Sequence, residues 1–260
     1  MTTKDKKVCV YILAKNEAQH IGRSLEALSP TGWDVVVLDS GSTDDTERIA
    51  KSFSFVSFQE YQYIDHCKAY NDVTAQLAVG YDYSVILDAD MLVTDMLQKE
   101  INEKIKSPNL IEAMDAEILM YTGGLPLKYG SLCPPKAFVF ATGKSYFVNS
   151  GHGEKIKPGI AVTHANEKLL HDDRKSYASY LLSQLRYSKN LVVRTAANQM
   201  SVRDWLRTKT PLLIFVVPLV SYVVKMGFLS GRAGGLYALD RLIAEAIMYR
   251  QALSKKMSDM

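Results

Sequence analysis

The chain has 260 residues, enough for one sizeable α/β domain and an appendage, and its hydrophobic content of 47% is ordinary for a globular enzyme. Its cysteines, Cys9, Cys67 and Cys133, are too scattered for a disulfide framework or a metal cluster, which favours a reducing compartment. The net charge of +3 conceals a basic surplus in residues 171–260, but this surplus coincides with apolar sequence, so we expect no nucleic-acid partner.

The N-terminal part of the chain alternates short apolar runs with helical stretches. Residues 8–13 form a continuous apolar run, typical of a strand that is buried on both faces, and a helical pattern follows over 21–28. A second apolar run, 34–38, ends at Asp39, and the turn and cap residues of 40–46 lead into the next helix. Strands and helices that alternate with short loops predict right-handed crossovers and a parallel sheet.

A third apolar run, 83–87, ends in two carboxylates, Asp88 and Asp90, separated by one residue. In a parallel sheet this end meets the earlier strand ends at Leu13 and Asp39 on one edge, which is where open α/β folds hold ligands. Divalent cations such as Mg²⁺ favour carboxylate and phosphate oxygens as ligands. The pair therefore suits a complex of a metal ion with a diphosphate.

The three strand ends together resemble the motifs of the family 2 glycosyltransferases, inverting enzymes of the GT-A fold. The matching segments, in the family's order, are Asn16-Glu17, the Asp-Ser-Gly-Ser-Thr-Asp run of 39–44, and Asp88-Ala89-Asp90. The likeness covers residues 8 to about 100, is looser beyond, and points toward bacterial enzymes that extend lipopolysaccharide cores or lipid-linked glycans. It implies an α/β, Rossmann-like GT-A fold, with a mostly parallel sheet flanked by helices.

The resemblance also implies roles at the donor site. Asp90 would bind a divalent metal, Mn²⁺ or Mg²⁺, and Asp88 the ribose or a metal-bound water. Asp39 would accept the imide proton of uracil, and Glu17 would bind a ribose hydroxyl, with Asn16 in the same nucleotide-sugar site.

Three further residues are candidates at the donor site, and two of them, Lys68 and His171, also have a second interpretation. Lys68 and Asn71 lie on a predicted helix before the metal strand, where the family often places groups near the donor diphosphate, and a solvated helix face explains Lys68 equally well. His171 corresponds to a late histidine that some GT-A enzymes use as an additional metal or diphosphate ligand. A histidine before a helix is as often a cap or a surface residue.

An inverting transfer needs a base that deprotonates the acceptor hydroxyl. The family often supplies it from an acidic pair downstream of the metal motif, and Asp172-Asp173 would stand in for that pair here. Glu154, in the loop Gly151-His152-Gly153-Glu154, is a rival. We rank Asp173 first and Asp172 second. The alternative for the pair is a helix N-terminus stabilised by negative charge.

The most apolar segment of the chain, 211–224, lies in its basic part, where residues 171–260 hold 14 Lys and Arg against 6 Asp and Glu. It is shorter than the ~20 residues that a bilayer span needs, and Pro218 interrupts it. Basic and aromatic neighbours, such as Trp205 and Lys225, favour attachment at an anionic membrane surface. A buried helical hairpin or a dimer contact would be the alternatives.

Two parts of the chain are therefore expected. Residues 1–200 would form a GT-A catalytic domain, and residues 201–260 a helical, membrane-associating appendage in which 227–235 forms a flexible bend. Residues 1–7 are polar and lead straight into the first strand, so we expect no signal peptide. The expected location is the cytoplasm, peripherally associated with the cytoplasmic face of the inner membrane.

The predicted activity is a metal-dependent, inverting transfer of one sugar, hexosyl or N-acetylhexosaminyl, from a UDP-sugar to a hydroxyl of a lipid-anchored glycan. The acceptor would be a lipopolysaccharide core or a polyprenyl-linked oligosaccharide, and the product β-linked. The alternative from another class is a catalytically silent, membrane-associated nucleotide-binding or scaffold protein. A nucleotidyltransferase is less favoured, because residues 14–17 lack the Gly-rich, basic phosphate loop that normally follows its first strand.

Overall fold

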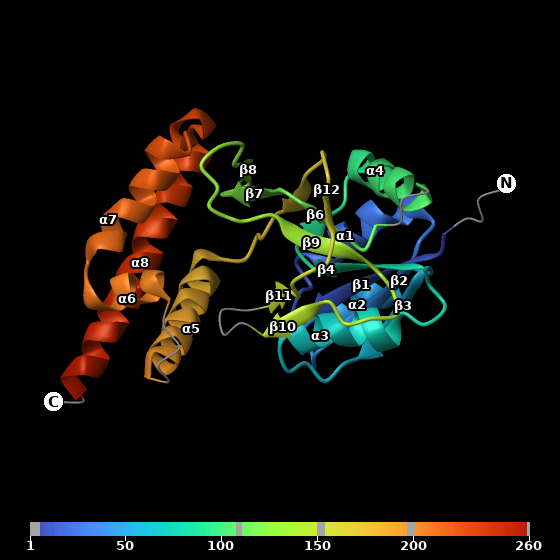
Figure 1. Ribbon diagram of the computed structural model, residues 1–260, viewed down its shortest axis with the longest axis horizontal. Helices are drawn as coiled ribbons and strands as arrows, with labels where there is room; N and C mark the ends of the chain where they lie inside the picture. Colours follow the sequence, from blue (N-terminus) through green and yellow to red (C-terminus); the bar gives the residue numbers. More distant parts are fainter. Residues whose placement is uncertain (1–5, 108–110, 150–153, 197–200, 259–260) are drawn as a thin grey trace. The chain divides into compact units, whose positions relative to one another are not determined.

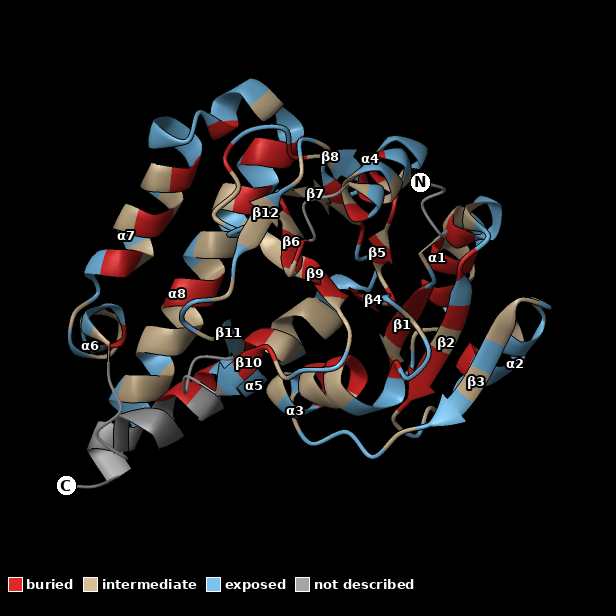
Figure 2. Cartoon of the chain, turned by 45° about the vertical axis from the view of Figure 1, so that its right-hand side comes forward, coloured by how far each residue is buried: buried red, intermediate tan, exposed pale blue. Residues whose placement is uncertain are grey.

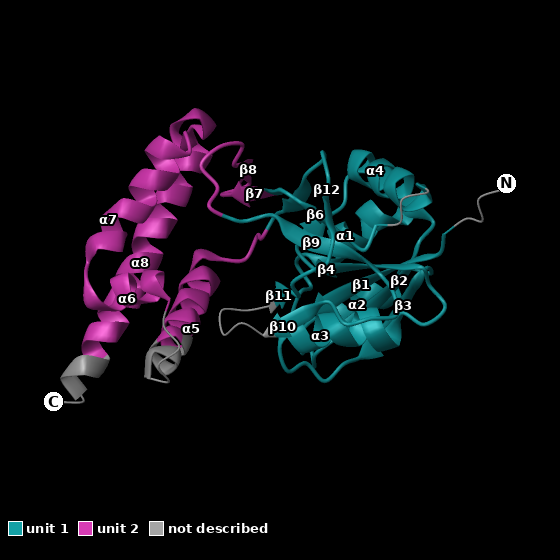
Figure 3. Ribbon diagram, in the orientation of Figure 1, with its two compact units in different colours: residues 1–118, 133–172 teal, residues 119–132, 173–260 magenta. Residues whose placement is uncertain are grey.

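The computed structural model describes residues 6–107, 111–149, 154–196 and 201–258 (Figure 1). The chain divides into two compact units (Figure 3): residues 1–118 with 133–172, and residues 119–132 with 173–260. The main division thus lies between residues 172 and 173 and not at the predicted boundary near 200. The reason is that the helix following residue 173 packs against the last helix of the chain.

The first unit is built on a seven-stranded sheet of order β12-β6-β9-β4-β1-β2-β3. Neighbouring strands among β1 to β4 pair in parallel, whereas β9 is antiparallel to both β4 and β6, and β12 is parallel to β6. The strands are β1 (Val8–Ala14), β2 (Asp34–Asp39), β3 (Val56–Glu60), β4 (Tyr83–Asp88), β6 (Ala113–Ala116), β9 (Lys136–Ala141) and β12 (Val162–His164). The predicted α/β class with a mostly parallel sheet is confirmed.

Alternating side chains of β1 enter two different hydrophobic clusters. Val10 and Ile12 belong to one cluster, and Cys9 and Tyr11 to the other, so the sheet is buried on both faces. Figure 2 shows β1 almost wholly in the colour of buried residues. This burial explains why the strand is continuously apolar in sequence.

Helices cover both faces of this sheet. Residues of α1 and α4 pack in the first cluster, and residues of α3 in the second. Helix α1 buries Ile21, Leu25 and Leu28, as the spacing predicts, and a 3-10 turn with a left-handed Gly32 follows it. The helices are α1 (Ile21–Leu28), α2 (Thr46–Lys51), α3 (His66–Asp72, continued by a π turn, Val73–Leu77) and α4 (Asp95–Lys106).

Two short antiparallel pairs complete the first unit. β5 (Met91–Leu92) pairs with β13 (Leu169–His171), which sets His171 opposite Met91. β10 (Phe147–Asn149) pairs with β11 (Glu154–Ile156). The pairing of β5 with β13 brings a late segment of the chain next to the Asp88–Asp90 motif.

The second unit is mainly helical, as expected for the C-terminal part. Its elements are the hairpin β7 (Ile118–Thr122) and β8 (Leu125–Pro126), α5 (Tyr177–Ala196), α6 (Val202–Lys209), α7 (Leu212–Leu219), a π turn (Val220–Val224), a 3-10 turn (Gly227–Ser230) and α8 (Arg232–Ser258). Pro218 lies inside α7. No helix in the part of the chain that the structure describes is long and apolar enough to cross a membrane.

The segment 227–235 differs from the expected flexible bend. It forms the 3-10 turn and the first turn of α8. A Cβ at Gly234 would lie 1.8 Å from the carbonyl oxygen of Gly227, and one at Gly130 would lie 2.6 Å from the Cα of Gly227. These glycines serve close backbone packing, and a sequence pattern alone does not distinguish that role from flexibility.

Candidate functional site

The carboxyl ends of three strands meet at one edge of the first unit's sheet. In the register of β1 with β2, Ala14 pairs with Asp39, and in that of β1 with β4, Leu13 pairs with Asp88. The predicted convergence of these strand ends is therefore confirmed. Five of the predicted site residues, Asn16, Glu17, Asp39, Asp88 and Asp90, lie at or just after these strand ends.

Asp39 is buried and organises the loop that follows β2. Its Oδ2 accepts hydrogen bonds from the backbone N–H groups of Gly41 and Ser42, at 3.0 and 2.8 Å, and its Oδ1 accepts one from Ser42 Oγ at 2.5 Å. Gly41 has a φ of +83°, a conformation that favours glycine. Each carboxylate oxygen has two acceptor positions, so Oδ1 retains one for a further donor.

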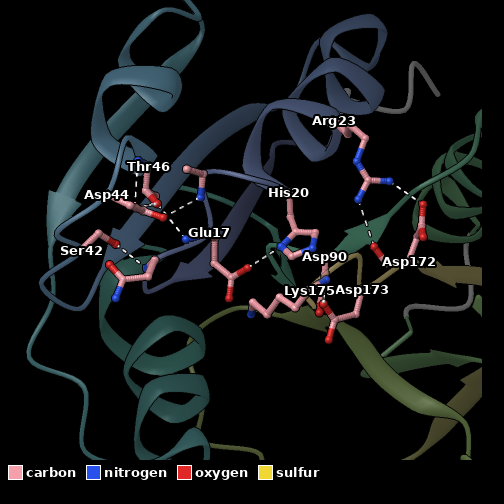
Figure 4. Close-up of polar contacts among 12 residues, drawn as sticks. Glu17, His20, Arg23, Ser42, Asp44, Thr46, Asp90, Asp172, Asp173 and Lys175 are labelled. Carbon is pink, nitrogen blue, oxygen red and sulfur yellow. Dashed lines mark hydrogen bonds and ion pairs between the residues drawn. The ribbon is translucent and has the colours of Figure 1, made fainter. Parts of the chain in front are cut away.

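Asn16 ties the end of β1 to the same loop. Its backbone adopts a left-handed φ of +56°, its N–H donates to Ser42 Oγ at 2.8 Å, and its Oδ1 accepts from the N–H of Thr43 at 2.8 Å. The next N–H, that of Glu17, donates to Thr46 Oγ1 at 2.8 Å. The two predicted nucleotide-binding loops are thus cross-linked, as Figure 4 shows for the side chains of Ser42 and Thr46.

The carboxylate of Glu17 has a partner that sequence reasoning missed. His20, which is fully buried, places Nδ1 2.7 Å from Glu17 Oε2 (Figure 4). The two residues lie three positions apart in the turn that leads into α1, where the N–H groups of His20 and Ile21 both donate to the carbonyl of Glu17, at 2.8 and 2.9 Å. This spacing was the available signal. His20 orients the carboxylate of Glu17 at the edge of the sheet.

The two residues predicted to bind metal lie next to each other. His171 Nε2 is 3.2 Å from Asp90 Oδ2, because β13 pairs with the segment that follows Asp90. Burial would lower the pKa of His171, but the hydrogen bond to Asp90 and the charges of Asp90 and Asp88 raise it above its usual value. The other ring nitrogen, Nδ1, is buried and has no hydrogen-bond partner among the described residues. His171 lies in a strand, and not directly before a helix as the sequence suggested.

Asp90 and His171 would supply only some of the ligands that a divalent metal needs. Carboxylate and imidazole are both ligands that Mn²⁺ accepts. Among the described residues there is no group of three or more His, Cys, Asp or Glu side chains placed to hold a metal ion. Asp90 and His171 would therefore hold the ion together with phosphate oxygens and water, an arrangement typical of Mg²⁺ sites at phosphate-bearing substrates.

Asp88 has a different partner, Lys136, which sequence reasoning also missed. Lys136 Nζ lies 2.5 Å from Asp88 Oδ2 and 5.8 Å from the ring centroid of Tyr70. Burial by itself would lower the pKa of Lys136, but the contacts with Asp88 and Tyr70 raise it well above its usual range. The only sequence signal was one lysine at the start of the apolar strand β9.

Arg23 on α1 holds the end of β13. Its guanidinium donates to Asp172 Oδ2 at 2.5 Å and to the Asp172 carbonyl at 3.0 Å, while the Asp172 N–H donates to the carbonyl of Asp90 at 3.0 Å (Figure 4). Asp172 is buried. Arg23 therefore positions the strand that carries His171, and it occupies the carboxylate of one base candidate.

Asp173 and Glu154, the other base candidates, stay predictions. Asp173 is the first residue of the second unit's segment 173–260 and precedes α5, its side chain is exposed, and its Oδ1 accepts from the N–H of Lys175 at 2.9 Å. Glu154 opens β11, and its side chain lies outside the described residues. Residues 151–153 of its loop lie outside them as well.

Lys68 and Asn71 lie on α3, as predicted, and both contact protein groups. Lys68 Nζ lies 2.7 Å from Asp72 Oδ2, an i,i+4 pair, and its side chain is about half exposed. Asn71 clamps β10, because its Nδ2 donates to the carbonyl of Phe147 at 3.0 Å and its Oδ1 accepts from the Phe147 N–H at 2.9 Å. Their roles toward a donor diphosphate stay predictions.

Comparisons with known proteins find similarities to the first part of the chain. Residues 9–115 match the family model described as Glycosyl transferase family 2. A curated relative, the "Uncharacterized glycosyltransferase RP128" of Rickettsia prowazekii (strain Madrid E), is 30% identical over 122 residues, which are 45% of this chain and 40% of that protein. The chain thus spans less than half of the length of this relative.

Two solved structures are similar to the chain at low identity. Glucosyl-3-phosphoglycerate synthase from Mycobacterium tuberculosis, in complex with Mn²⁺, UDP and glucosyl-3-phosphoglycerate, is 23% identical, with a TM-score of 0.37 over 46% of this chain and 45% of that one. S. aureus TarS 1-349 is 14% identical, with a TM-score of 0.48 over 97% of this chain and 92% of that one. At these identities and TM-scores, neither structure indicates the function of this chain.

Proposed function

We propose that this chain is an inverting glycosyltransferase that moves one sugar from a UDP-sugar to a hydroxyl of a lipid-anchored glycan and forms a β-linkage. The sugar would be hexosyl or N-acetylhexosaminyl, and the acceptor a lipopolysaccharide core or a polyprenyl-linked oligosaccharide. The observation that carries the proposal is the convergence of Glu17, Asp39 and Asp88 at one sheet edge, next to the Asp90–His171 pair. The match of residues 9–115 to the family model supports it.

The donor would lie along this edge. Asp39 would accept the imide proton of uracil with its remaining acceptor position, and Glu17, held by His20, would accept a ribose hydroxyl. Asp90 and His171 would hold Mn²⁺ or Mg²⁺, which when bound neutralises the diphosphate leaving group. The nucleobase and the diphosphate of the donor would thus each lie near groups of matching chemistry.

The transfer also requires a base. As the acceptor oxygen bonds to the anomeric carbon, the bond from that carbon to the diphosphate oxygen breaks, and the hydroxyl proton passes to a carboxylate. We assign this proton to Asp173, whose carboxylate is exposed, before Asp172, whose carboxylate is buried against Arg23. Glu154 is the remaining candidate.

An exposed apolar face of the second unit supports a lipid-anchored acceptor and peripheral attachment to an anionic membrane. Leu212, Phe215 and Leu219 are 51, 67 and 58% exposed and recur at spacings of three and four, so they share one face of α7. Lys209 and Lys225, both exposed, lie just before and after this helical segment. Apolar side chains next to lysines suit the boundary between acyl chains and anionic headgroups.

A thermal-shift panel tests the donor site. Melting temperatures would be measured with UDP, GDP, dTDP and CMP, each with and without Mn²⁺, because a ligand that binds only the folded state raises the melting temperature. We expect the largest shift with UDP, an increase of that shift by Mn²⁺, and loss of the increase in Asp90→Ala.

The matched control for this panel is Asp82→Ala. Asp82 immediately precedes β4, at the end opposite to Asp90, and accepts a hydrogen bond from the N–H of Lys7, so its loss removes a carboxylate next to the same strand but far from the site. A folded protein that no nucleotide stabilises would overturn the proposal. That result would favour the silent scaffold instead.

A further inference from the structure

Lys136 occupies a position that the predicted donor chemistry does not explain. Its side chain is only 17% exposed, its Nζ lies 2.5 Å from Asp88 Oδ2, and the ammonium stands over the ring of Tyr70. Burying an ammonium is unfavourable unless it is paired and hydrogen-bonded. The contact with Asp88 satisfies that condition and at the same time commits one oxygen of the first carboxylate of the motif.

The two carboxylates of the motif therefore differ in their surroundings. Asp90 faces the imidazole of His171, whereas Asp88 faces the ammonium of Lys136. Asp88 Oδ1 accepts no hydrogen bond from the described residues, and the side chain of Asp88 is 31% exposed. Asp88 thus presents one open oxygen to solvent and one that is already occupied.

We propose that Lys136 is a positioning residue that keeps Asp88 out of the metal's coordination and reserves its open oxygen for a hydroxyl of the bound donor. The inference rests on the proposed function for the identity of the donor. It explains why Asp88, only two residues from Asp90, does not complete a three-ligand group among the described residues. A metal held by few protein ligands keeps more coordination positions for phosphate oxygens.

The inference predicts that loss of Lys136 tightens metal binding. In Lys136→Met, the ammonium that occupies one oxygen of the Asp88 carboxylate is removed. Asp88 can then join Asp90 and His171 as a third protein ligand of the metal. We expect Mn²⁺ alone, titrated by electron paramagnetic resonance, to bind at least tenfold more tightly than to the unaltered protein. Water-proton relaxation should show fewer water molecules on the bound Mn²⁺. UDP affinity should fall, because the oxygen reserved for the donor is consumed.

A double-mutant cycle separates ligation from simple charge repulsion. If Asp88 becomes a ligand, the double variant Lys136→Met with Asp88→Asn returns to the original Mn²⁺ affinity, and Asp88→Asn alone changes that affinity little. If Lys136 affected Mn²⁺ binding only through the electrostatic repulsion between its ammonium and the metal ion, Asp88→Asn would weaken Mn²⁺ binding by about as much as Lys136→Met strengthens it. That symmetric outcome would overturn the inference.

Lys144→Met is the matched control, because it removes an ammonium of the same unit that pairs with Glu112 and is 45% exposed. It should leave the Mn²⁺ affinity unchanged. Lys136→Gln, which keeps an N–H donor for Asp88 but removes the charge, replaces the methionine variant if that variant does not fold, and should change the affinity in the same direction.

Different results would overturn the role of Lys136 and the proposed donor site. An Mn²⁺ affinity in folded Lys136→Met no tighter than in the unaltered protein overturns the inference, whatever nucleotide binds. Absence of nucleotide binding by the unaltered protein overturns the proposed donor site, whereas the Mn²⁺ cycle reports on Lys136 and Asp88 directly.

Discussion

The carboxyl edge of the first unit and the α7 face of the second unit are built in opposite ways. At the sheet edge, polar side chains are cross-linked by hydrogen bonds, as between Asp39 and Ser42 or Glu17 and His20. On α7, Leu212, Phe215 and Leu219 are each more than half exposed. The first arrangement fixes polar groups in position before a ligand arrives. The second offers apolar area without fixing a geometry, which suits a fluid or adaptable partner.

Loss of Asp90 should have the largest effect and tests whether the polar sheet edge binds a metal. Asp90→Ala removes the carboxylate that faces His171, so we expect metal-dependent sugar transfer to fall by at least a thousandfold while the protein stays folded. Transfer from radiolabelled UDP-sugar and the circular dichroism spectrum measure the two quantities. Retained activity in Asp90→Ala, with Asp82→Ala as the reference, would contradict the metal assignment.

Asp173→Asn should come next and would separate binding from chemistry. The amide keeps the size of the side chain but cannot take the acceptor proton, so turnover should fall about 10²–10⁴-fold. UDP affinity, measured by calorimetry, should stay within about twofold. Asp172→Asn and Glu154→Gln are the comparison variants. Near-normal turnover in Asp173→Asn, together with a large loss in one of these two, would move the base to that residue.

Arg207→Met tests whether the second unit also depends on a fixed polar contact. Arg207 forms a bidentate pair with the buried Glu245, at 2.8 and 2.6 Å, and joins α6 to α8. Removing the arginine leaves a buried carboxylate unpaired, which should lower the free energy of unfolding by about 3 kcal/mol. Urea unfolding of the single variant and of Arg207→Met with Glu245→Gln measures it. The double variant should recover part of the loss, and equal stability of all three proteins would contradict the pair's role.

Phe215→Glu should have the smallest effect and tests whether the exposed apolar face of α7 contacts a membrane. A carboxylate at the 67% exposed position opposes both apolar insertion and attraction to anionic lipid. We expect about tenfold weaker binding to vesicles that contain phosphatidylglycerol, measured by co-sedimentation, and unchanged UDP binding. Val79→Glu, which places the same charge on an exposed apolar residue of the first unit, is the control. Equal losses in both variants would refute a specific role of α7.

Local patterns predicted the sheet's central strands because burial on both faces leaves a strong signal. The apolar runs that end near Leu13, Asp39 and Asp88 correspond to β1, β2 and β4. The antiparallel direction of β9 was not predictable, since direction depends on the path of the chain between strands. The strand β13 was missed, because three residues carry too little periodicity.

The site was predictable where its residues follow strand ends and was missed where they come from elsewhere. Asp90 and His171 were paired by resemblance, and the structure places them 3.2 Å apart. His20 precedes α1 as its N-cap and Arg23 lies on α1, whereas the apolar spacing of that helix drew attention to Ile21, Leu25 and Leu28. Lys136 was one lysine beside an apolar strand, and solvated lysines in such positions are common.

The order of the strands along the chain and the acidic residues at their ends depend on contiguous residues, so sequence patterns predict both. Which charged side chains meet depends on the folded arrangement of distant segments. Lys136 is 48 positions from Asp88, and Arg23 is 149 positions from Asp172. Such pairs depend on how strands associate into a sheet, and strand association depends on burial of the whole unit. The different partners of Asp88 and Asp90, two residues apart in sequence, are a consequence of that packing.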